Sequence, residues 1–262
     1  MKPLISIITP VYNSEKFIEE TILSVINQDY FNFEYIIVDG NSTDNTLQII
    51  NKYKDQITHI LSEPDKGMYD AINKGVKIAK GEILAYINSD DIYFPQTLTS
   101  IASVFEKEEF DLCFGYTKFI GFDGKLKFKH KAINFSKENV LSMGRLPFCQ
   151  QSCFFSRRLY DHLNGFDENL KYVGDTKFFL SAYLLSDSKI TILKKYLAAF
   201  RLHQSCFSVA QKDKMQNERN TMMENILSIK NRKSFRYYLR KLSSEFIIKL
   251  FNINNVVLKY FK

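Results

Sequence analysis

Two adjacent carboxylates stand directly after an apolar run of the chain. The run Ile83–Ile87 has the length of a buried strand and leads into Asn88, Ser89, Asp90 and Asp91. Neighbouring carboxylates repel each other and resist desolvation unless a cation neutralises them. Oxygen ligands of this kind suit Mg2+ or Mn2+ held against phosphate. The pattern therefore predicts a cation-binding loop, and the alternative is an acidic turn exposed to solvent.

Two earlier apolar runs end in polar residues in the same way. Leu4–Ile8 leads into Thr9–Asn13, and Glu34–Val38 leads into Asp39–Asp44. Apolar residues at helical spacing follow each polar segment, and Ser14 can cap the first of these helices. Strands that alternate with helices form a mostly parallel sheet, which binds ligands beyond the carboxyl ends of its strands. We therefore expect the three polar strand ends to converge on one site.

Length and composition indicate one large domain with an appendage. With 262 residues, of which 45% are hydrophobic, the chain can bury a substantial core. We expect an α/β fold over residues 1–225, with a Rossmann-like, mostly parallel central sheet flanked by helices. Residues 226–262 are expected to form a basic amphipathic helical segment.

The positive charge of the chain is concentrated in this last segment. The formal charge is +7, yet from Leu227 onward nine Lys or Arg face the single acid Glu245, so the body before them carries −1. A body without excess positive charge argues against a nucleic-acid partner. Apolar residues recur at helical spacing from Phe235 to Leu250. This pattern suits peripheral contact with an anionic membrane or, equally, packing on the protein or on a second subunit.

The amino-terminal apolar stretch is short. Thr9, Pro10 and Asn13 interrupt it far below the length of a signal peptide or a membrane span. We therefore expect a cytoplasmic protein, with the basic tail as a possible contact to the inner face of the plasma membrane.

A turn with both charges lies between the second and fourth strands. Pro64 and Gly67 mark the turn, and Asp65, Lys66 and Asp70 stand at the entrance of the following helix. Such a loop can bring a cationic side chain and backbone N–H groups to a diphosphate or a sugar. The alternative is ordinary turn and capping chemistry.

Four of these segments, in this order and at this spacing, resemble family 2 glycosyltransferases with the GT-A fold. They are Thr9-Pro10-Val11-Tyr12-Asn13, Val38 to Asp44, Asp65-Lys66-Gly67 with Asp70 to Gly75, and Asn88-Ser89-Asp90-Asp91. The resemblance covers about residues 3–205. It implies inverting transfer of a sugar from a nucleoside-diphosphate donor, a UDP-sugar before others, with Mn2+ or Mg2+ as cofactor. The implied acceptor is a saccharide or lipid-linked saccharide of a bacterial surface polysaccharide, such as a capsule, O-antigen or exopolysaccharide.

The resemblance also implies roles for individual residues. Asp90 corresponds to the metal-binding acid, Asp39 would accept a hydrogen bond from the nucleobase, and His203 is a candidate metal or phosphate ligand or else a structural histidine. Asn88 departs from the pattern, because many relatives have Asp there; an amide adds no charge to the metal site. The implied nucleotide-sugar-binding residues are Thr9, Pro10, Tyr12, Asn13, Asp39, Asp65, Lys66, Asp70, Ser89 and Asp91.

The resemblance places the general base at Asp175. Inverting transfer needs a carboxylate that takes the proton of the acceptor hydroxyl, and Asp175 stands at the start of an apolar helix. The alternative is an acid placed there by the helix dipole alone. Gln150 and Gln151 resemble a polar pair near the acceptor. If Pro147–Arg158 is a regular strand followed by a helix, only one of the two glutamines can face the site.

Two other classes of function remain open. One is a catalytically idle nucleotide-sugar-binding or interaction subunit of a polysaccharide assembly complex. The other is a nucleotidyltransferase, which would need a Gly-rich, basic loop after the first strand that Thr9–Asn13 does not provide.

Overall fold

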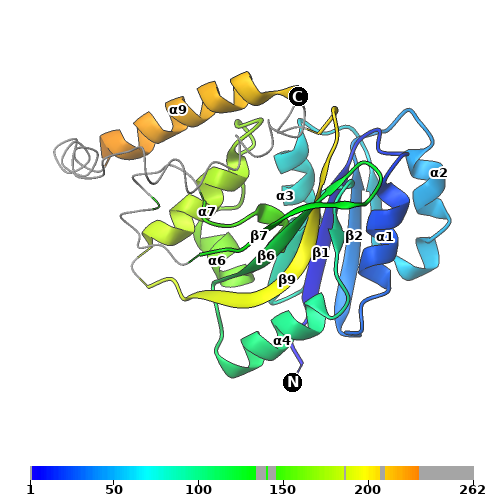
Figure 1. Cartoon of the computed structure of the whole chain (residues 1–262), viewed down its shortest axis with the longest axis horizontal. Helices are drawn as coiled ribbons and strands as arrows, with labels where there is room; N and C mark the ends of the chain where they lie inside the picture. Colours follow the sequence, from blue (N-terminus) through cyan, green and yellow to red (C-terminus); the bar gives the residue numbers. More distant parts are fainter. Residues whose placement is uncertain (1, 134–139, 141–145, 186, 207–209, 230–262) are drawn as a thin grey trace.

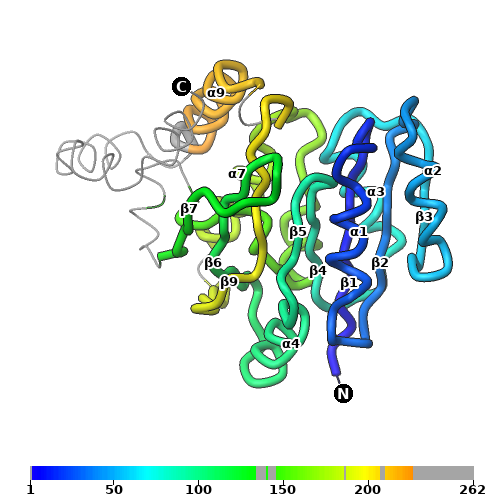
Figure 2. Tube along the Cα trace, turned by 45° about the vertical axis from the view of Figure 1, so that its right-hand side comes forward, coloured from blue at the N-terminus to red at the C-terminus, as the bar shows by residue number. Residues whose placement is uncertain are grey.

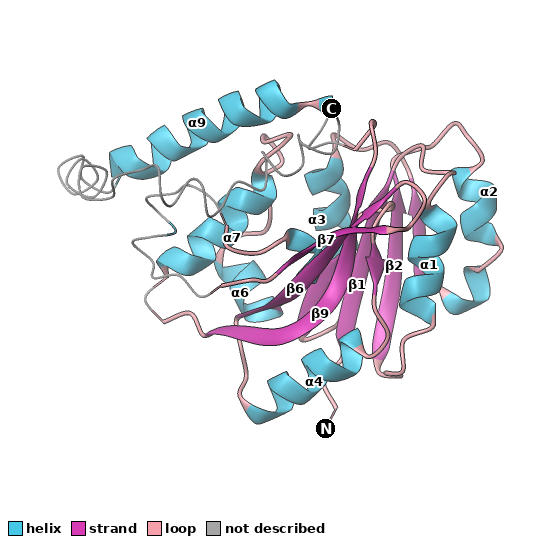
Figure 3. Cartoon of the chain, viewed as in Figure 1, coloured by secondary structure: helices cyan, strands magenta, loops and turns pink. Residues whose placement is uncertain are grey.

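The structure is a computed structural model that describes residues 2–133, 140, 146–185, 187–206 and 210–229. Its centre is a twisted sheet with helices on both faces (Figures 1 and 3). The strands are β1 Ile5–Val11, β2 Phe33–Asp39, β3 His59–Ser62, β4 Ile83–Tyr86, β5 Ile92–Tyr93, β6 Leu112–Gly121, β7 Leu126–His130, β8 Cys153–Ser156 and β9 Ile190–Leu202. They are ordered β3-β2-β1-β4-β8-β6-β9-β5, with β7 beside β6.

The helices form two layers, one on each face of the sheet (Figure 2). One apolar cluster packs α1, α2 and α4 on one face, and a second packs α3, α6 and α7 on the other. The helices are α1 Ile18–Ile26, α2 Thr46–Asn51, α3 Met68–Ile78, α4 Thr97–Lys107, α6 Arg157–His162, α7 Gly174–Leu184 and α9 Lys212–Ile229, with 3-10 turns η1 Lys54–Gln56 and η2 Gln150–Ser152.

The predicted parallel arrangement is confirmed for the first half of the chain. β1 runs parallel to both β2 and β4, and β2 runs parallel to β3. Val11 at the end of β1 pairs with Asp39 at the end of β2. The second half is mixed, because β8 is antiparallel to both β4 and β6 while β9 is parallel to β6. The carboxyl ends of β1, β2 and β4 therefore share one edge of the sheet.

The first helix begins later than its sequence suggested. α1 starts at Ile18, and its N-cap position has no side-chain hydrogen bond. Ser14, the expected cap, instead forms a hydroxyl–hydroxyl hydrogen bond of 2.6 Å with Ser89. The bond joins the segment after β1 to the acidic segment after β4. The Ser14 side chain therefore links two loops and does not cap the N-terminus of α1.

The carboxyl-terminal part is described only as far as Ile229. α9 continues across the expected boundary at residues 225 and 226, and most of the predicted amphipathic segment 226–262, namely residues 230–262, lies outside the described residues. Among the described helices, none combines the length and the apolar character needed to cross a lipid bilayer.

Candidate active site

The segments after β1 and β2 are tied together at the carboxyl edge of the sheet. The backbone N–H of Asn13 donates to Ser42 Oγ at 2.9 Å, and the N–H of Thr43 donates to Asn13 Oδ1 at 2.8 Å. Asn13 adopts φ 48°, a left-handed conformation that Asn tolerates. Of the expected donor-binding segment, Thr9 and Pro10 are buried within β1, whereas Tyr12 is 62% exposed.

Asp39 lies at the end of β2 and is fully buried. Its carboxylate accepts hydrogen bonds from the N–H and hydroxyl of Ser42 and, at 2.7 Å, from Ser62 Oγ. The Asp65 carboxylate packs against Gly40, the residue after Asp39, because a Cβ on Gly40 would lie 2.4 Å from Asp65 Oδ2. Only glycine at position 40 allows this approach. The structure thus brings Asp39 and Asp65 together, and the contact of Asp39 with a nucleobase stays a prediction.

The turn before α3 is shaped by its own carboxylates. Asp65 accepts a hydrogen bond from the Gly67 N–H, and Asp70 accepts one from the Lys66 N–H, both at 2.8 Å. Lys74 lies 3.5 Å from Asp70. The Lys66 ammonium is exposed and lies 3.7 Å from a carboxylate oxygen of Glu168. Of the three residues expected to bind the donor here, Lys66 alone extends a charged group into solvent, while Asp65 and Asp70 hold the turn.

Asp90 and His203 meet at the end of the sheet although 113 positions separate them. His203 Nε2 lies 2.9 Å from Asp90 Oδ2, and its Nδ1 lies 2.8 Å from Ser205 Oγ. To bind a cation through Nε2, the ring would carry its proton on Nδ1, where the Ser205 hydroxyl can accept it. Asp90 and His203, the two metal ligands predicted from the sequence, therefore lie close enough to bind the same cation.

The neighbouring Asn88 provides a further test of whether this site suits a metal. Its side-chain oxygen Oδ1 is buried and has no hydrogen-bond partner within the described part of the chain. A buried acceptor without a partner is costly, and a bound cation would satisfy it. No group of three or more His, Cys, Asp or Glu gathers as a metal cage within the described ranges. Asn88, Asp90 and His203 nevertheless supply oxygen and nitrogen donors that fit Mn2+ or Mg2+.

Asp91 has a different environment from the one we expected for a donor-binding residue. Its carboxylate is fully buried and accepts hydrogen bonds from Gln151 Nε2 at 2.9 Å, from Asn88 Nδ2 at 3.3 Å and from the Arg201 backbone N–H at 2.9 Å. Burial, and then the charge of Asp90, raise the pKa of Asp91 well above its usual range. A donor could reach Asp91 only by displacing one of these partners, so in this structure Asp91 positions its neighbours.

Gln150 and Gln151 lie in the 3-10 turn η2, not in a strand as we predicted. Strand alternation therefore does not apply to them, and both amides point toward the end of β4. Gln150 Nε2 donates to the Tyr86 carbonyl at 2.7 Å, while Gln151 binds Asp91. The strand begins only at Cys153. The prediction of a strand at Gln150 and Gln151 was wrong, because the backbone turns before Cys153, and the limit of one glutamine facing the site therefore no longer holds.

Arg201 is a residue of this site that the sequence analysis did not identify. Its side chain is 1% exposed, yet its guanidinium donates to the Asp90 carbonyl at 3.0 Å and to Glu20 Oε2 at 2.6 Å. Its carbon atom Cζ lies 4.9 Å from the centre of the Phe17 ring. The signal in the sequence is an arginine within the apolar end of β9, two positions before His203. Arg201 thus joins the end of β9, which leads into His203, to the acidic loop and to Glu20 of α1.

Asp175 lies in the first turn of α7, as predicted. Its Oδ1 accepts hydrogen bonds from the Tyr69 hydroxyl at 3.2 Å and from the Thr176 N–H at 2.6 Å. Burial raises the pKa of the Asp175 carboxyl, although these hydrogen bonds and the charge of Arg219 oppose the rise. The charges of Asp175 and Asp91 both act on the buried Tyr86 hydroxyl. The candidate base and the acidic loop therefore flank the same strand end.

Comparison with known proteins identifies the family. Residues 6–163 match the profile of Glycosyl transferase family 2. The chain belongs to this family. It is 29% identical over 209 residues to an uncharacterized glycosyltransferase of Rickettsia prowazekii, across 75% of this chain and 65% of that protein. It is 31% identical over 198 residues to a poly(ribitol-phosphate) beta-glucosyltransferase of Bacillus spizizenii, across 73% of this chain and 31% of that protein. This family 2 chain thus spans less than two thirds of each relative.

Solved structures show that the family 2 chain has a GT-A type fold. S. aureus TarS 1-349 in complex with UDP is 25% identical, with a TM-score of 0.65 over 85% of this chain and 65% of that one. The mannosyltransferase PcManGT from Pyrobaculum calidifontis, in complex with GDP-Man and Mn2+, is 16% identical, with a TM-score of 0.66 over 92% of this chain and 69% of that one. The predicted fold class is confirmed by this similarity.

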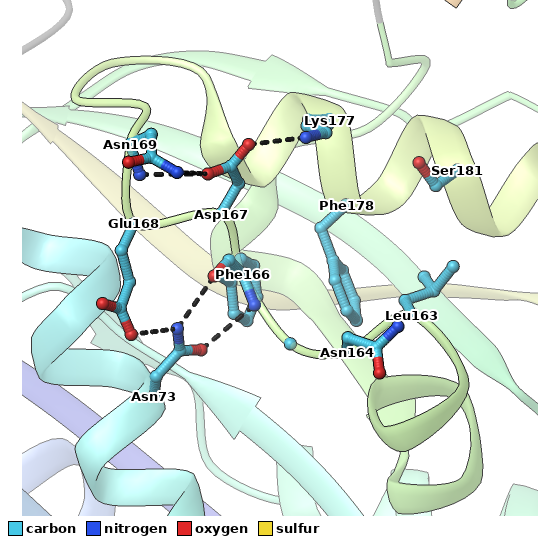
Figure 4. Close-up of a pocket in the computed structure, with 11 residues that line it drawn as sticks. Asn73, Leu163, Asn164, Phe166, Asp167, Glu168, Asn169, Lys177, Phe178 and Ser181 are labelled. Atoms are coloured by element: carbon cyan, nitrogen blue, oxygen red, sulfur yellow. Dashed lines mark hydrogen bonds and ion pairs between the residues drawn. The ribbon is translucent and has the colours of Figure 1, made fainter.

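A pocket of about 410 Å³ lies beside α7 (Figure 4). Its floor is Phe166, which stacks on Tyr69 with ring centres 5.9 Å apart. Asn73 and the Asp167–Lys177 ion pair stand at its wall. None of the residues that we predicted for the site lines this pocket. Its relation to Asp175 is through Phe166, which stacks on the Tyr69 ring whose hydroxyl donates to Asp175.

Proposed function

We propose that the chain is an inverting glycosyltransferase that moves a sugar from a nucleoside-diphosphate donor to a saccharide or lipid-linked saccharide of a bacterial surface glycan. The observation that carries this proposal is the arrangement along one sheet edge. Ser42 donates to Asp39 and accepts a hydrogen bond from Asn13, and the next residue, Ser14, is hydrogen-bonded to Ser89. Ser89 precedes Asp90, which pairs with His203. On the other side of the acidic loop, the charge of Asp175 acts on Tyr86 at the end of β4. Family membership and the GT-A fold support the reading of this edge as a donor site.

The donor half would bind the nucleoside at the ends of β1 and β2. There Tyr12 is exposed beside Asn13. The hydroxyl groups that donate to Asp39 can rotate away, which would free its carboxylate to accept a hydrogen bond from a nucleobase. Lys66 extends from the turn before α3 toward solvent and can meet the diphosphate. A UDP-sugar is our first choice of donor, because the similar TarS structure holds UDP.

Asn88, Asp90 and His203 would hold the divalent cation, with diphosphate oxygens completing its coordination. When bound, the cation stabilises negative charge on the departing diphosphate. The chain's own contribution is to fix this donor set. Arg201 holds the Asp90 main chain, and Ser205 orients the imidazole of His203.

Asp175 would act as the general base. The acceptor hydroxyl oxygen attacks the anomeric carbon on the face opposite the diphosphate, the bond from that carbon to the diphosphate breaks, and Asp175 takes the hydroxyl proton. A carboxyl whose pKa is raised by burial is a stronger base than an exposed one. Gln150 and Gln151 would support the acceptor side indirectly, by holding Tyr86 and Asp91.

A thermal-shift screen tests this proposal most directly. UDP, GDP and their sugars are added with and without Mn2+, and the best donor is then tested for transfer. We expect one nucleotide class to raise the melting temperature, more so with Mn2+. An Asp90→Asn variant should lose the Mn2+ increment. If no nucleotide diphosphate shifts the wild-type chain under any condition, the proposal fails.

An idle nucleotide-sugar-binding subunit is the second candidate function. It would show the same thermal shift but no transfer and no release of UDP from the bound donor. The hydrogen-bonded Asp175 at the start of α7 favours the enzyme, because simple donor binding does not require a partly desolvated base.

A further inference from the structure

Helix α9 lies beyond the residues that match the family profile, yet it contacts the segment that carries the candidate base. It runs along the outside of the molecule near α7 (Figure 1). Met222 is only 4% exposed, and Met223 and Ile226 pack against the core cluster that contains α7. α9 is therefore docked on the body of the protein through one apolar face.

One carboxylate of α9 binds three successive backbone N–H groups. Glu218 accepts hydrogen bonds from Lys171 at 2.9 Å, from Tyr172 at 2.6 Å and from Val173 at 2.9 Å. These residues immediately precede Gly174, the first residue of α7. Hydrogen bonds to an ionised carboxylate are roughly twice as strong as neutral ones, and negative charge is stabilised near a helix N-terminus.

The opposite side of the same segment is also fixed. A Cβ on Gly174 would lie 2.7 Å from the Tyr69 ring, so the backbone there is packed directly on α3. Tyr69 in turn donates to Asp175. The backbone that leads into Asp175 is thus held between the Tyr69 ring on one side and the Glu218 carboxylate on the other.

We infer that Glu218 is a positioning residue for the general base. α9 would then form part of the acceptor half of the active site, by which we mean Asp175 and the residues that hold it. Glu218 fixes the backbone of residues 171–173, and this backbone sets where the Asp175 carboxylate lies relative to the attacking hydroxyl. This inference rests on the proposed role of Asp175. A displacement of about 1 Å in a reacting group can lower a rate about 100-fold, so a rigid support has catalytic value.

The residue after Glu218 acts on Asp175 through its charge. Arg219 lowers the pKa of Asp175 and opposes the effect of burial. The other titratable groups that interact with Asp175 are Tyr69 of α3, Tyr86 of β4 and Cys153 of β8. Among these groups Arg219 supplies the positive charge, so its loss should raise the pKa of Asp175.

The test compares Glu218→Gln and Glu218→Ala with the matched control Glu224→Gln, which removes an exposed carboxylate from the same helix. We expect kcat to fall about 10-fold or more in Glu218→Ala and less in Glu218→Gln, whose amide keeps one acceptor oxygen. The KM of the donor and the affinity for UDP should stay within about twofold of wild type, because Glu218 binds the backbone of residues 171–173, which leads to Asp175 and not to the donor loops. The control should match wild type.

A second measurement separates positioning from a general loss of stability. Each variant is assayed well below its melting temperature, so that all of the protein is folded and a fall in kcat reports on the active site. Equal kcat in Glu218→Ala and wild type, or loss of UDP affinity in step with kcat, would overturn the inference.

Asp175→Asn distinguishes this outcome from failure of the proposed function. If Asp175→Asn retains wild-type transfer, Asp175 is not the base and the function as proposed is wrong. If Asp175→Asn is inactive while the Glu218 variants behave like Glu224→Gln, the base assignment stands and only the role of α9 is refuted.

Discussion

The donor half and the acceptor half of the candidate site are built in different ways. In the donor half, the ends of β1, β2 and β4 lie together because parallel strands with helical crossovers must end at one edge. In the acceptor half, Asp175 obtains its surroundings from helices distant in the sequence, namely Tyr69 of α3 and Glu218 of α9. Strand topology therefore brings the loops of the first half to one edge, whereas helix packing positions the second half.

The two halves also differ in how tightly their carboxylates are held. Asp91 is fully buried, and three hydrogen bonds from protein groups hold it in place. Asp175 is partly exposed, and Tyr69 donates a hydrogen bond to it from another element of the fold. We expect changes in the donor half to affect stability first and changes in the acceptor half to affect the rate first.

The largest effect is expected from Asp175→Asn. Removing the base should lower the rate of transfer by about 10²- to 10⁴-fold, the usual contribution of general-base catalysis. The affinity for UDP should not change, because the donor half keeps all of its contacts. The measurement is kcat from product formation together with UDP titration calorimetry. A variant that transfers sugar as fast as wild type would remove the functional distinction between the two halves.

Arg201→Met is expected to have the next largest effect, and on stability. It removes the buried guanidinium that donates to the Asp90 and Phe122 carbonyls and to Glu20, and the loss of these hydrogen bonds should cost about 1–3 kcal/mol. Denaturant unfolding measures the loss. Lys125→Met, which breaks the exposed pair with Asp123, is the control and should cost less than about 1 kcal/mol. Equal losses in the two variants would show that the buried arginine does not stabilise the donor half.

Tyr69→Phe should change the pH dependence of the rate with little effect on the fold. The Tyr69 hydroxyl lowers the pKa of Asp175, so its removal raises that pKa and protonates the base at a higher pH. The acid limb of kcat/KM should therefore move to higher pH in Tyr69→Phe. Tyr160→Phe removes a hydroxyl bound to Asn73 and serves as the control. An unmoved acid limb in Tyr69→Phe would mean that another group sets the profile.

Ending the chain at Ile229 should have the smallest effect on either half. This change keeps α9 and removes residues 230–262. Transfer to a short soluble acceptor should remain near wild type, while binding to anionic vesicles should weaken by about 1 kcal/mol for each cation that contacts the surface. Vesicle co-sedimentation provides the measurement, with neutral vesicles as the control. Unchanged partitioning would favour the alternative that the tail packs on protein.

The sequence analysis succeeded where local pattern and topology agree. Apolar runs that end in polar residues predicted the edge with Asp39 and Asp90, and the helix entrance at Asp175 was placed correctly. It was wrong for the glutamine pair, because the residues before Cys153 form a 3-10 turn that strand-like composition does not reveal. It missed Arg201 because a buried arginine in a strand is recognisable only from the partners that surround it.

The sequence by itself determined the family, the α/β class and the edge of the sheet that carries the candidate site, since these depend on short-range periodicity and on the order of the elements. Only the tertiary structure decided which carboxylates are held inside, such as Asp91, and which partners support the candidate base. Those properties depend on contacts between segments far apart in the chain, such as Asp90 with Arg201 and Glu218 with the loop before Asp175. Burial and hydrogen bonding, rather than residue type, give each acid its role.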